Sequence, residues 1–186
     1  MPIDRRRAEG LAFLVAFAAC IPAANWLIGH VGTVCVPGGP CLIPVAPGLS
    51  APSGVLMIGL ALVLRDLVQR RLGLAWVLGA ILAGAVLSAA VAPASLVVAS
   101  GVAFLVSELA DCAVFTPLQR RGLVLAVFFS SVAGLVVDSA LFLLLAFGNL
   151  AYLPGQIVGK AWMVVLALPV VWWLRNRDRR LGLAPA

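Results

Sequence analysis

The sequence predicts an all-α integral membrane protein with six transmembrane helices. Of its 186 residues, 63% are hydrophobic and 11% are charged, and the mean hydropathy is +1.14. A soluble domain is about half apolar and about a quarter charged, so this chain is too apolar to be one. No segment alternates polar and apolar residues over ~10 positions, as the strands of an outer-membrane barrel do. Helices are then expected, because they satisfy their own backbone hydrogen bonds within a bilayer.

The predicted spans are apolar stretches separated by residues that favour turns. A helical span needs ~20 residues, and breaks are marked by Pro37-Gly38-Gly39-Pro40, Pro93 and Gly148-Asn149. The whole chain is interpreted as one six-helix domain. Its spans are residues 10–30, 52–68, 72–91, 94–115, 123–147 and 151–174, and residues 31–51 form an external loop.

Arginine clusters predict the orientation of these spans. They precede the first span, link the second to the third and the fourth to the fifth, and follow the sixth, whereas the other three connections contain no Lys or Arg. Cations gather in cytoplasmic loops, so both termini are expected on the cytoplasmic side of a bacterial inner membrane. The net charge of +6 is explained in this way and does not indicate nucleic-acid binding. Three spans per half are compatible with a 3+3 inverted arrangement.

Two of the four cysteines, Cys35 and Cys41, flank a Pro-Gly-rich turn in the predicted external loop. The outer side of a bacterial membrane is oxidising, so we expect a disulfide that fixes this loop, with two free thiols as the alternative. The spacing does not match a zinc ribbon, and we predict no metal site.

Several ionisable residues fall inside or at the edge of the apolar stretches, where a charge costs ~2.5–3.5 kcal/mol at the bilayer centre. Such groups are expected to face one another or a wet cavity. They are Arg65, Asp66, Glu108, Asp111, Asp138 and Lys160, and Asn25 and Gln156 add neutral polar groups.

Glu108 and Asp111 are three residues apart and share one face of the fourth span. This pair could hold a proton or accept hydrogen bonds from a ligand; alternatively, it neutralises Lys160 or Arg65 across a helix interface. Gln156 and Lys160 share a face of the sixth span. Lys160 could pair with Glu108, Asp111 or Asp138, or donate to a ligand carbonyl.

Arg65 and Asp66 are interpreted either as a functional group or as an ion pair at the inner end of the second span. Because they are adjacent in sequence, they are not expected to face each other, and Asp66 is expected to line up with Arg70.

Motifs for enzymatic chemistry are absent from the sequence. It contains no Gly-x-x-x-x-Gly-Lys-Ser/Thr loop, no His-Glu-x-x-His and no Gly-x-Ser-x-Gly, and its one histidine, His30, lies beside a loop. We therefore predict that the protein is not an enzyme and needs no cofactor.

Three later stretches carry a resemblance to a known family. Ser107-Glu108-Leu-Ala-Asp111 resembles the fourth-span motif of the VUT (vitamin uptake transporter) family, the queuosine precursor transporters. Gly134-Leu-Val-Val-Asp138-Ser139 resembles the fifth-span motif, and Gly155-Gln156-Ile-Val-Gly159-Lys160 the start of the sixth. Leu64-Arg65-Asp66 with Gly73 is similar to the second span of that family.

The resemblance implies import of 7-cyano-7-deazaguanine, 7-aminomethyl-7-deazaguanine or both across the inner membrane. A carboxylate from Glu108, Asp111 or Asp138 would accept the adjacent N–H and amino groups of the guanine edge. Gln156 or Lys160 would donate to its carbonyl, and an aromatic ring would stack on the base. The candidates for stacking are Phe104, Phe142 and Trp162, and Asn25 is expected at the cavity mouth.

Other readings remain open. The chain could be the substrate-binding subunit of a multi-component, ATP-driven vitamin importer, and small residues such as Ala8, Ala12 and Ala16 are reminiscent of a docking surface. These faces are also compatible with a homodimer in the lipid bilayer. A membrane scaffold would not need the buried charges. A membrane enzyme would need a reactive group that the sequence lacks.

Overall fold

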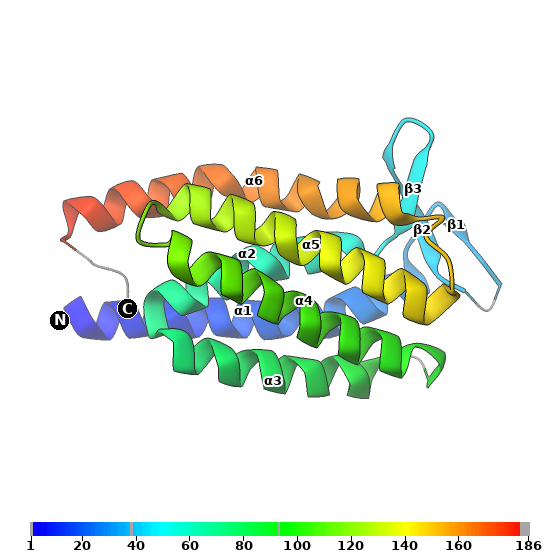
Figure 1. Cartoon of the computed structure of the whole chain (residues 1–186), viewed down its shortest axis with the longest axis horizontal. Coiled ribbons are helices and arrows are strands. Elements are labelled where there is room, and N and C mark those ends of the chain that lie inside the picture. The colour runs from blue at the N-terminus through cyan, green and yellow to red at the C-terminus, as the bar shows by residue number, and fades with distance from the viewer. Residues whose placement is uncertain (1, 38, 93, 183–186) are drawn as a thin grey trace.

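The computed structural model describes residues 2–37, 39–92 and 94–182, which form a helical bundle with a small sheet at one end (Figure 1). The helices are α1 (Pro2–His30), α2 (Val55–Leu72), α3 (Leu74–Val91), α4 (Val97–Leu118), α5 (Leu123–Phe147) and α6 (Leu153–Arg180), and a 3-10 turn (Ala94–Leu96) precedes α4. The strands are β1 (Val34–Cys35), β2 (Cys41–Ala46) and β3 (Leu49–Pro52).

All six helices run along the long axis of the molecule, and consecutive helices alternate in direction (Figure 1). The start of α1 and the end of α6 therefore lie at the same end of the bundle, opposite the sheet. Among the described residues, α1, α3, α4, α5 and α6 are long and apolar enough to cross a membrane. The prediction of a multi-pass, all-α membrane protein is thus confirmed for five helices.

Helix α2 is the exception, because it carries four charged residues among its 18: Arg65, Asp66, Arg70 and Arg71. All four side chains are buried. The helix contacts each of the other five helices, so protein rather than lipid surrounds these charges. A charged helix is tolerated in a membrane when it faces the bundle interior and its groups are paired. Its position explains how α2 can run beside the five apolar helices.

The core is formed mainly where α2 packs against α4, α5 and α6. Leu62, Phe115, Val127 and Val171 are buried there, with exposures of 0%. A second cluster joins α1, α2 and α4 through Phe17, Ile21, Ala61 and Phe104. The two clusters hold α2 in the centre of the bundle.

The turn between α2 and α3 consists of Gly73 alone, which has a φ of 92°. Residues with side chains rarely adopt this backbone conformation, so glycine permits the chain to reverse within one residue. Its amide also caps α2 by donating to the carbonyl of Gln69.

The loop predicted at residues 31–51 contains a three-stranded antiparallel sheet, which the hydropathy pattern does not predict. Strand β2 lies in the middle, pairing Cys41 with Cys35 and Ile43 with Ala51. A register shift falls between Pro44 and Ala46, where proline cannot donate to the ladder. The sheet is attached to the helices by the hydrogen bond from Ser53 Oγ to the Leu27 carbonyl, at 2.7 Å.

Candidate functional site

A cavity lies inside the half of the bundle nearest the sheet. Its walls come from the ends of α1, α3 and β3, the starts of α2, α4 and α6, and the later part of α5. The polar residues that line it are Asn25, Ser88, Ser100, Asp138, Gln156 and Lys160, and the aromatic ones are Phe104 and Phe142. Its volume is about 60 Å³. A cavity of about 150 Å³ holds a single benzene, so the cavity as it stands in this structure is smaller than a bicyclic ring needs.

Lys160 forms the polar centre of this cavity. Its Nζ donates to Asp138 Oδ2 at 2.5 Å, and to Ser139 Oγ and Gln156 Oε1, both at 2.8 Å. The side chain of Lys160 is 1% exposed, and Gln156 is 2% exposed. A buried ammonium is tolerated when its hydrogen bonds are made and an anion lies beside it. All three donor positions of Lys160 are occupied in this arrangement.

Close packing of α2 on α6 sets the position of Lys160. A Cβ atom added to Gly59 would lie 2.5 Å from the Lys160 carbonyl oxygen and 2.9 Å from its Cα. Glycine at this position therefore lets the two backbones approach each other closely. One helical turn before Lys160, Gln156 lies on the same face of α6, as its spacing predicts.

Two aromatic rings from neighbouring helices line the cavity. Phe104 of α4 is 4% exposed and packs against Phe17, with ring centroids 6.0 Å apart. Phe142 of α5 packs edge-on against Phe147. Asn25 lies in the last part of α1 and donates to the Ile21 carbonyl at 3.0 Å. Phe104, Phe142 and Asn25, which the sequence indicates as candidates for the binding site, all line the cavity.

Glu108 and Asp111 do not line the cavity; they pair with Arg65 of α2. Arg65 Nε lies 3.2 Å from Glu108 Oε2, and its Nη2 contacts Asp111 Oδ1 and lies 2.9 Å from Asp66 Oδ1. Asp66 also accepts a hydrogen bond from Ser130 Oγ at 2.7 Å. We call Arg65, Asp66, Glu108 and Asp111 the Arg65 cluster. The cation that the structure places beside Glu108 and Asp111 is Arg65 rather than Lys160.

The expected alignment of Asp66 with Arg70 was wrong. The two residues are four apart, but Asp66 turns toward Arg65 and Ser130, whereas Arg70 Nη2 lies 2.9 Å from Asp178 Oδ2. Arg65 and Asp66 do form the ion pair that was considered, although they are adjacent in sequence. A long guanidinium side chain can fold back along its helix, which spacing alone does not reveal.

Trp162, which the sequence predicts at the binding site, does not line the cavity. Its side chain is 51% exposed, and its indole N–H donates to the Val45 carbonyl of β2 at 2.9 Å. It therefore attaches the sheet to the outside of α6.

In the same sheet, Cys35 and Cys41 form a disulfide, while Cys20 and Cys112 are free and buried.

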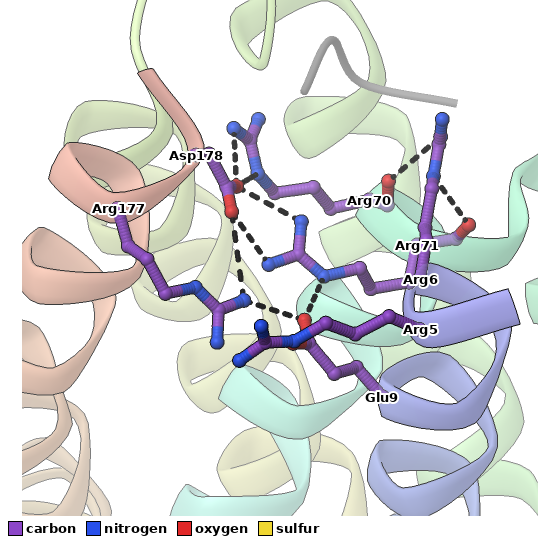
Figure 2. A network of polar contacts seen from close by, with 7 residues as sticks. All are labelled: Arg5, Arg6, Glu9, Arg70, Arg71, Arg177 and Asp178. Atoms are coloured by element: carbon purple, nitrogen blue, oxygen red, sulfur yellow. Dashed lines mark hydrogen bonds and ion pairs between the residues drawn. The ribbon is translucent and has the colours of Figure 1, made fainter. Parts of the chain in front are cut away.

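A third set of charges, which we call the terminal network, lies at the end of the bundle that holds the start of α1 and the end of α6 (Figure 2). Asp178 accepts hydrogen bonds from Arg70 and Arg71, at 2.8 to 3.0 Å. Glu9 pairs with Arg71 and Arg177. The full set is Arg5, Arg6, Glu9, Arg70, Arg71, Arg177 and Asp178.

Sequence reasoning used the arginines of this network only for orientation and gave no role to Glu9 or Asp178. The signal was nevertheless present. These are two of the seven acidic residues of the chain, and both lie beside arginine clusters. They connect α1, α2 and α6 and so close this end of the bundle.

Membrane-spanning helices around a buried, charged cavity define a class of protein: a multi-pass membrane protein with the interior of a transporter. Residues 90–174 match the family described as "Putative vitamin uptake transporter". The match runs from the end of α3 into α6 and contains Glu108, Asp111, Asp138 and Lys160. The match supports the resemblance to the VUT family that the sequence carries, and with it a transporter of the vitamin-uptake type. Comparisons with curated proteins and with solved structures gave no match.

Proposed function

We propose that the protein imports 7-deazaguanine precursors of queuosine across the bacterial inner membrane, without catalysing a reaction. The observation that carries this proposal is the placement of Asp138, Gln156 and Lys160 in one cavity beside Phe104 and Phe142. Its substrates are 7-cyano-7-deazaguanine, 7-aminomethyl-7-deazaguanine or both. Both termini lie in the cytoplasm, and the sheet lies outside.

The polar groups of the cavity match the edge of a guanine-like base. Such a base offers a ring N–H and an amino group side by side, and one carboxylate can accept both hydrogen bonds. Asp138 is the carboxylate that lines the cavity, so it takes this role rather than Glu108 or Asp111. The Gln156 amide donates to the ring carbonyl, or Lys160 does so by exchanging one of its present acceptors for the base. Phe104 and Phe142 supply faces on which the base stacks.

Selectivity follows from burial of these groups. Asp138 is 8% exposed and Gln156 is 2% exposed, so neither is well solvated. A site built to pair a polar edge rejects analogues that lack it by about 10⁴–10⁵, because its own groups are left unpaired. Adenine, which has no ring N–H beside its amino group, is therefore excluded.

The direction of entry follows from the two ends of the bundle. The cavity is lined by residues of the sheet end, including Asn25, Pro52 and Gly54, and the terminal network joins the helices at the other end. With arginines on the cytoplasmic side, the cavity lies toward the outside. Substrate enters beside the sheet, and the terminal network separates to release it inward.

Uptake into liposomes that contain only the purified protein tests this function. We expect selective uptake of radiolabelled 7-cyano-7-deazaguanine, competed by the unlabelled compound and not by adenine. The Asp138→Asn variant is expected to take up none, and Gly79→Ala, where an added Cβ meets no atom within 4 Å, serves as the folded control. Binding without any uptake would contradict a self-sufficient transporter.

The alternative is a substrate-binding subunit of an ATP-driven importer. It is favoured by the alanine face of α1, where Ala8, Ala12 and Ala19 are exposed and give a partner helix room to approach. In this case the protein would bind the deazapurine but would transport it only with a transmembrane coupling protein. Co-purification of such a protein from native membranes, lost in Ala12→Leu, would favour this alternative.

A further inference from the structure

The interior of the bundle holds more negative than positive groups. Outside the terminal network, the buried charged side chains of the described residues are Arg65 and Lys160 against Asp66, Glu108, Asp111 and Asp138. Lys160 is paired with Asp138. This leaves three carboxylates around the single guanidinium of Arg65. An unpaired charge in a low-dielectric interior is costly, and a carboxyl group there is neutralised by taking up a proton.

The three carboxyl groups of the Arg65 cluster differ in the hydrogen bonds that they receive. Glu108 receives a hydrogen bond from Arg65, and Asp66 receives one from Ser130. Asp111 is 0% exposed, and neither of its oxygens makes a well-aligned hydrogen bond within the described part of the chain, although Arg65, Ser130 and Asp66 lie beside it. Its Oδ1 contacts Arg65, but its Oδ2 faces the backbone of Gly134, where an added Cβ would lie 3.1 Å away.

The other titratable groups around the cluster supply no further positive charge. Cys112 of α4 and Cys20 of α1 are buried thiols near it, and Asp138 lies on the side toward the cavity. On the opposite side, Gln69 accepts a hydrogen bond from Arg65 Nη1 at 3.1 Å and donates to Thr116 at 2.9 Å. Arg65 is therefore the only cation in contact with the three carboxylates among the residues described.

Polar side chains connect the cluster to the cavity. Ser107 precedes Glu108 in α4, and its Oγ lies 3.5 Å from Asp138 Oδ1. Asp138 in turn binds Lys160. A change of charge in the cluster therefore alters the electrostatic potential at Asp138, the residue that we assign to substrate binding. Buried charges interact strongly over such short distances.

We propose that the Arg65 cluster is a proton-binding site, with Asp111 as the carboxyl group that holds the proton, and that this proton drives uptake. The proposal rests on the proposed function. One proton from the outside joins a carboxylate oxygen of the cluster, and the same O–H bond breaks when the proton leaves to the cytoplasm. No electrons are transferred. The substrate moves inward in the same cycle, so that the proton gradient supplies the driving force.

The proton can be detected without any substrate. In infrared spectra of the protein in lipid vesicles, a protonated carboxyl group gives a C=O band that is separate from carboxylate bands and shifts in D₂O. We expect this band at neutral pH in the wild type and its loss in Asp111→Asn. Glu9→Gln, which alters a partly exposed carboxylate of the terminal network, should leave it unchanged.

Two results would overturn the proton site. One is the absence of the band in the wild type. The other is a band that survives in Asp111→Asn, whether or not Asp66→Asn or Glu108→Gln removes it, or a band that disappears in Asp138→Asn, because the proton would then lie elsewhere. These amide substitutions keep the shape of the side chain, and the wild-type spectrum decides the first point even if a variant does not fold.

Coupling is tested separately, by uptake of labelled 7-cyano-7-deazaguanine into proteoliposomes under an imposed pH gradient. We expect accumulation when the outside is acidic, loss of that accumulation in Asp111→Asn, and retained binding of the base by this variant. Uptake that ignores the pH gradient, or that follows a sodium gradient instead, overturns proton coupling while the proposed function stands. An infrared band without any deazapurine binding refutes the proposed function while the proton site stands.

Discussion

The ammonium of Lys160 in α6 lies 2.5 Å from the carboxylate of Asp138 in α5, and both side chains line the cavity. Replacing Lys160 by Met leaves that carboxylate buried without its cation, which typically costs ~3–5 kcal/mol. We expect Lys160→Met to lower the free energy of unfolding by about 3 kcal/mol. Thermal unfolding in detergent, followed by tryptophan fluorescence, measures the change.

A second substitution separates lost pairing from lost packing. Adding Asp138→Asn to Lys160→Met removes the unpaired charge and should restore most of the stability, although substrate binding stays absent. A double variant that is no more stable than Lys160→Met would contradict the importance of this ion pair.

Close approach of α2 to α6 depends on Gly59. Alanine at this position would bring a Cβ within 2.5 Å of the Lys160 carbonyl oxygen, so the helices must separate and Lys160 must shift. We expect Gly59→Ala to lower the unfolding temperature and to weaken substrate binding. Gly79→Ala is the matched control, because a Cβ there meets no atom within 4 Å, and it should be neutral or slightly stabilising.

The terminal network predicts that its two acidic residues, Asp178 and Glu9, contribute unequally to the stability of the protein. Asp178 has a side chain that is 1% exposed and pairs with Arg70 and Arg71, which are themselves buried. Glu9 has a side chain that is 20% exposed. Asp178→Asn should therefore destabilise the protein by about 3 kcal/mol, and Glu9→Gln by ~1 kcal/mol or less. Equal effects in thermal unfolding would show that burial does not control the strength of these pairs.

The disulfide between Cys35 and Cys41 predicts a specific labelling pattern. Alkylation of the denatured protein without reductant should modify only the two free cysteines, Cys20 and Cys112, and all four after reduction. Intact mass spectrometry counts the modified thiols. Closing so short a loop stabilises by about 2 kcal/mol in the chain-entropy model, so the Cys35→Ser/Cys41→Ser variant should unfold at a lower temperature.

Apolar runs were sufficient to predict the bundle, because a helix that crosses a bilayer needs ~20 apolar residues and little else. They did not predict the sheet at residues 34–52, where short strands depend on pairing between segments. They also gave no sign that α2 is enclosed by the other helices. That position depends on contacts with five partners, which no single stretch of sequence records.

The candidate site could be predicted only in part for a similar reason. The spacing of Gln156 and Lys160 predicted that they share one face of α6. The position of Asp138 inside an apolar stretch indicated that it is a candidate site residue. Which helix each group faces is decided by packing, such as the approach at Gly59. The sequence therefore could not separate Asp138, on the cavity, from Glu108 and Asp111, which are held by Arg65.

Binding of 7-cyano-7-deazaguanine to the purified protein, measured by calorimetry for the wild type, Asp138→Asn and Glu9→Gln, tests the central claim most directly. We expect micromolar or tighter binding by the wild type and Glu9→Gln, weaker binding of guanine, and no binding by Asp138→Asn. The absence of binding by the wild type, or undiminished binding by a folded Asp138→Asn variant, would contradict the assignment of this cavity to the deazaguanine edge.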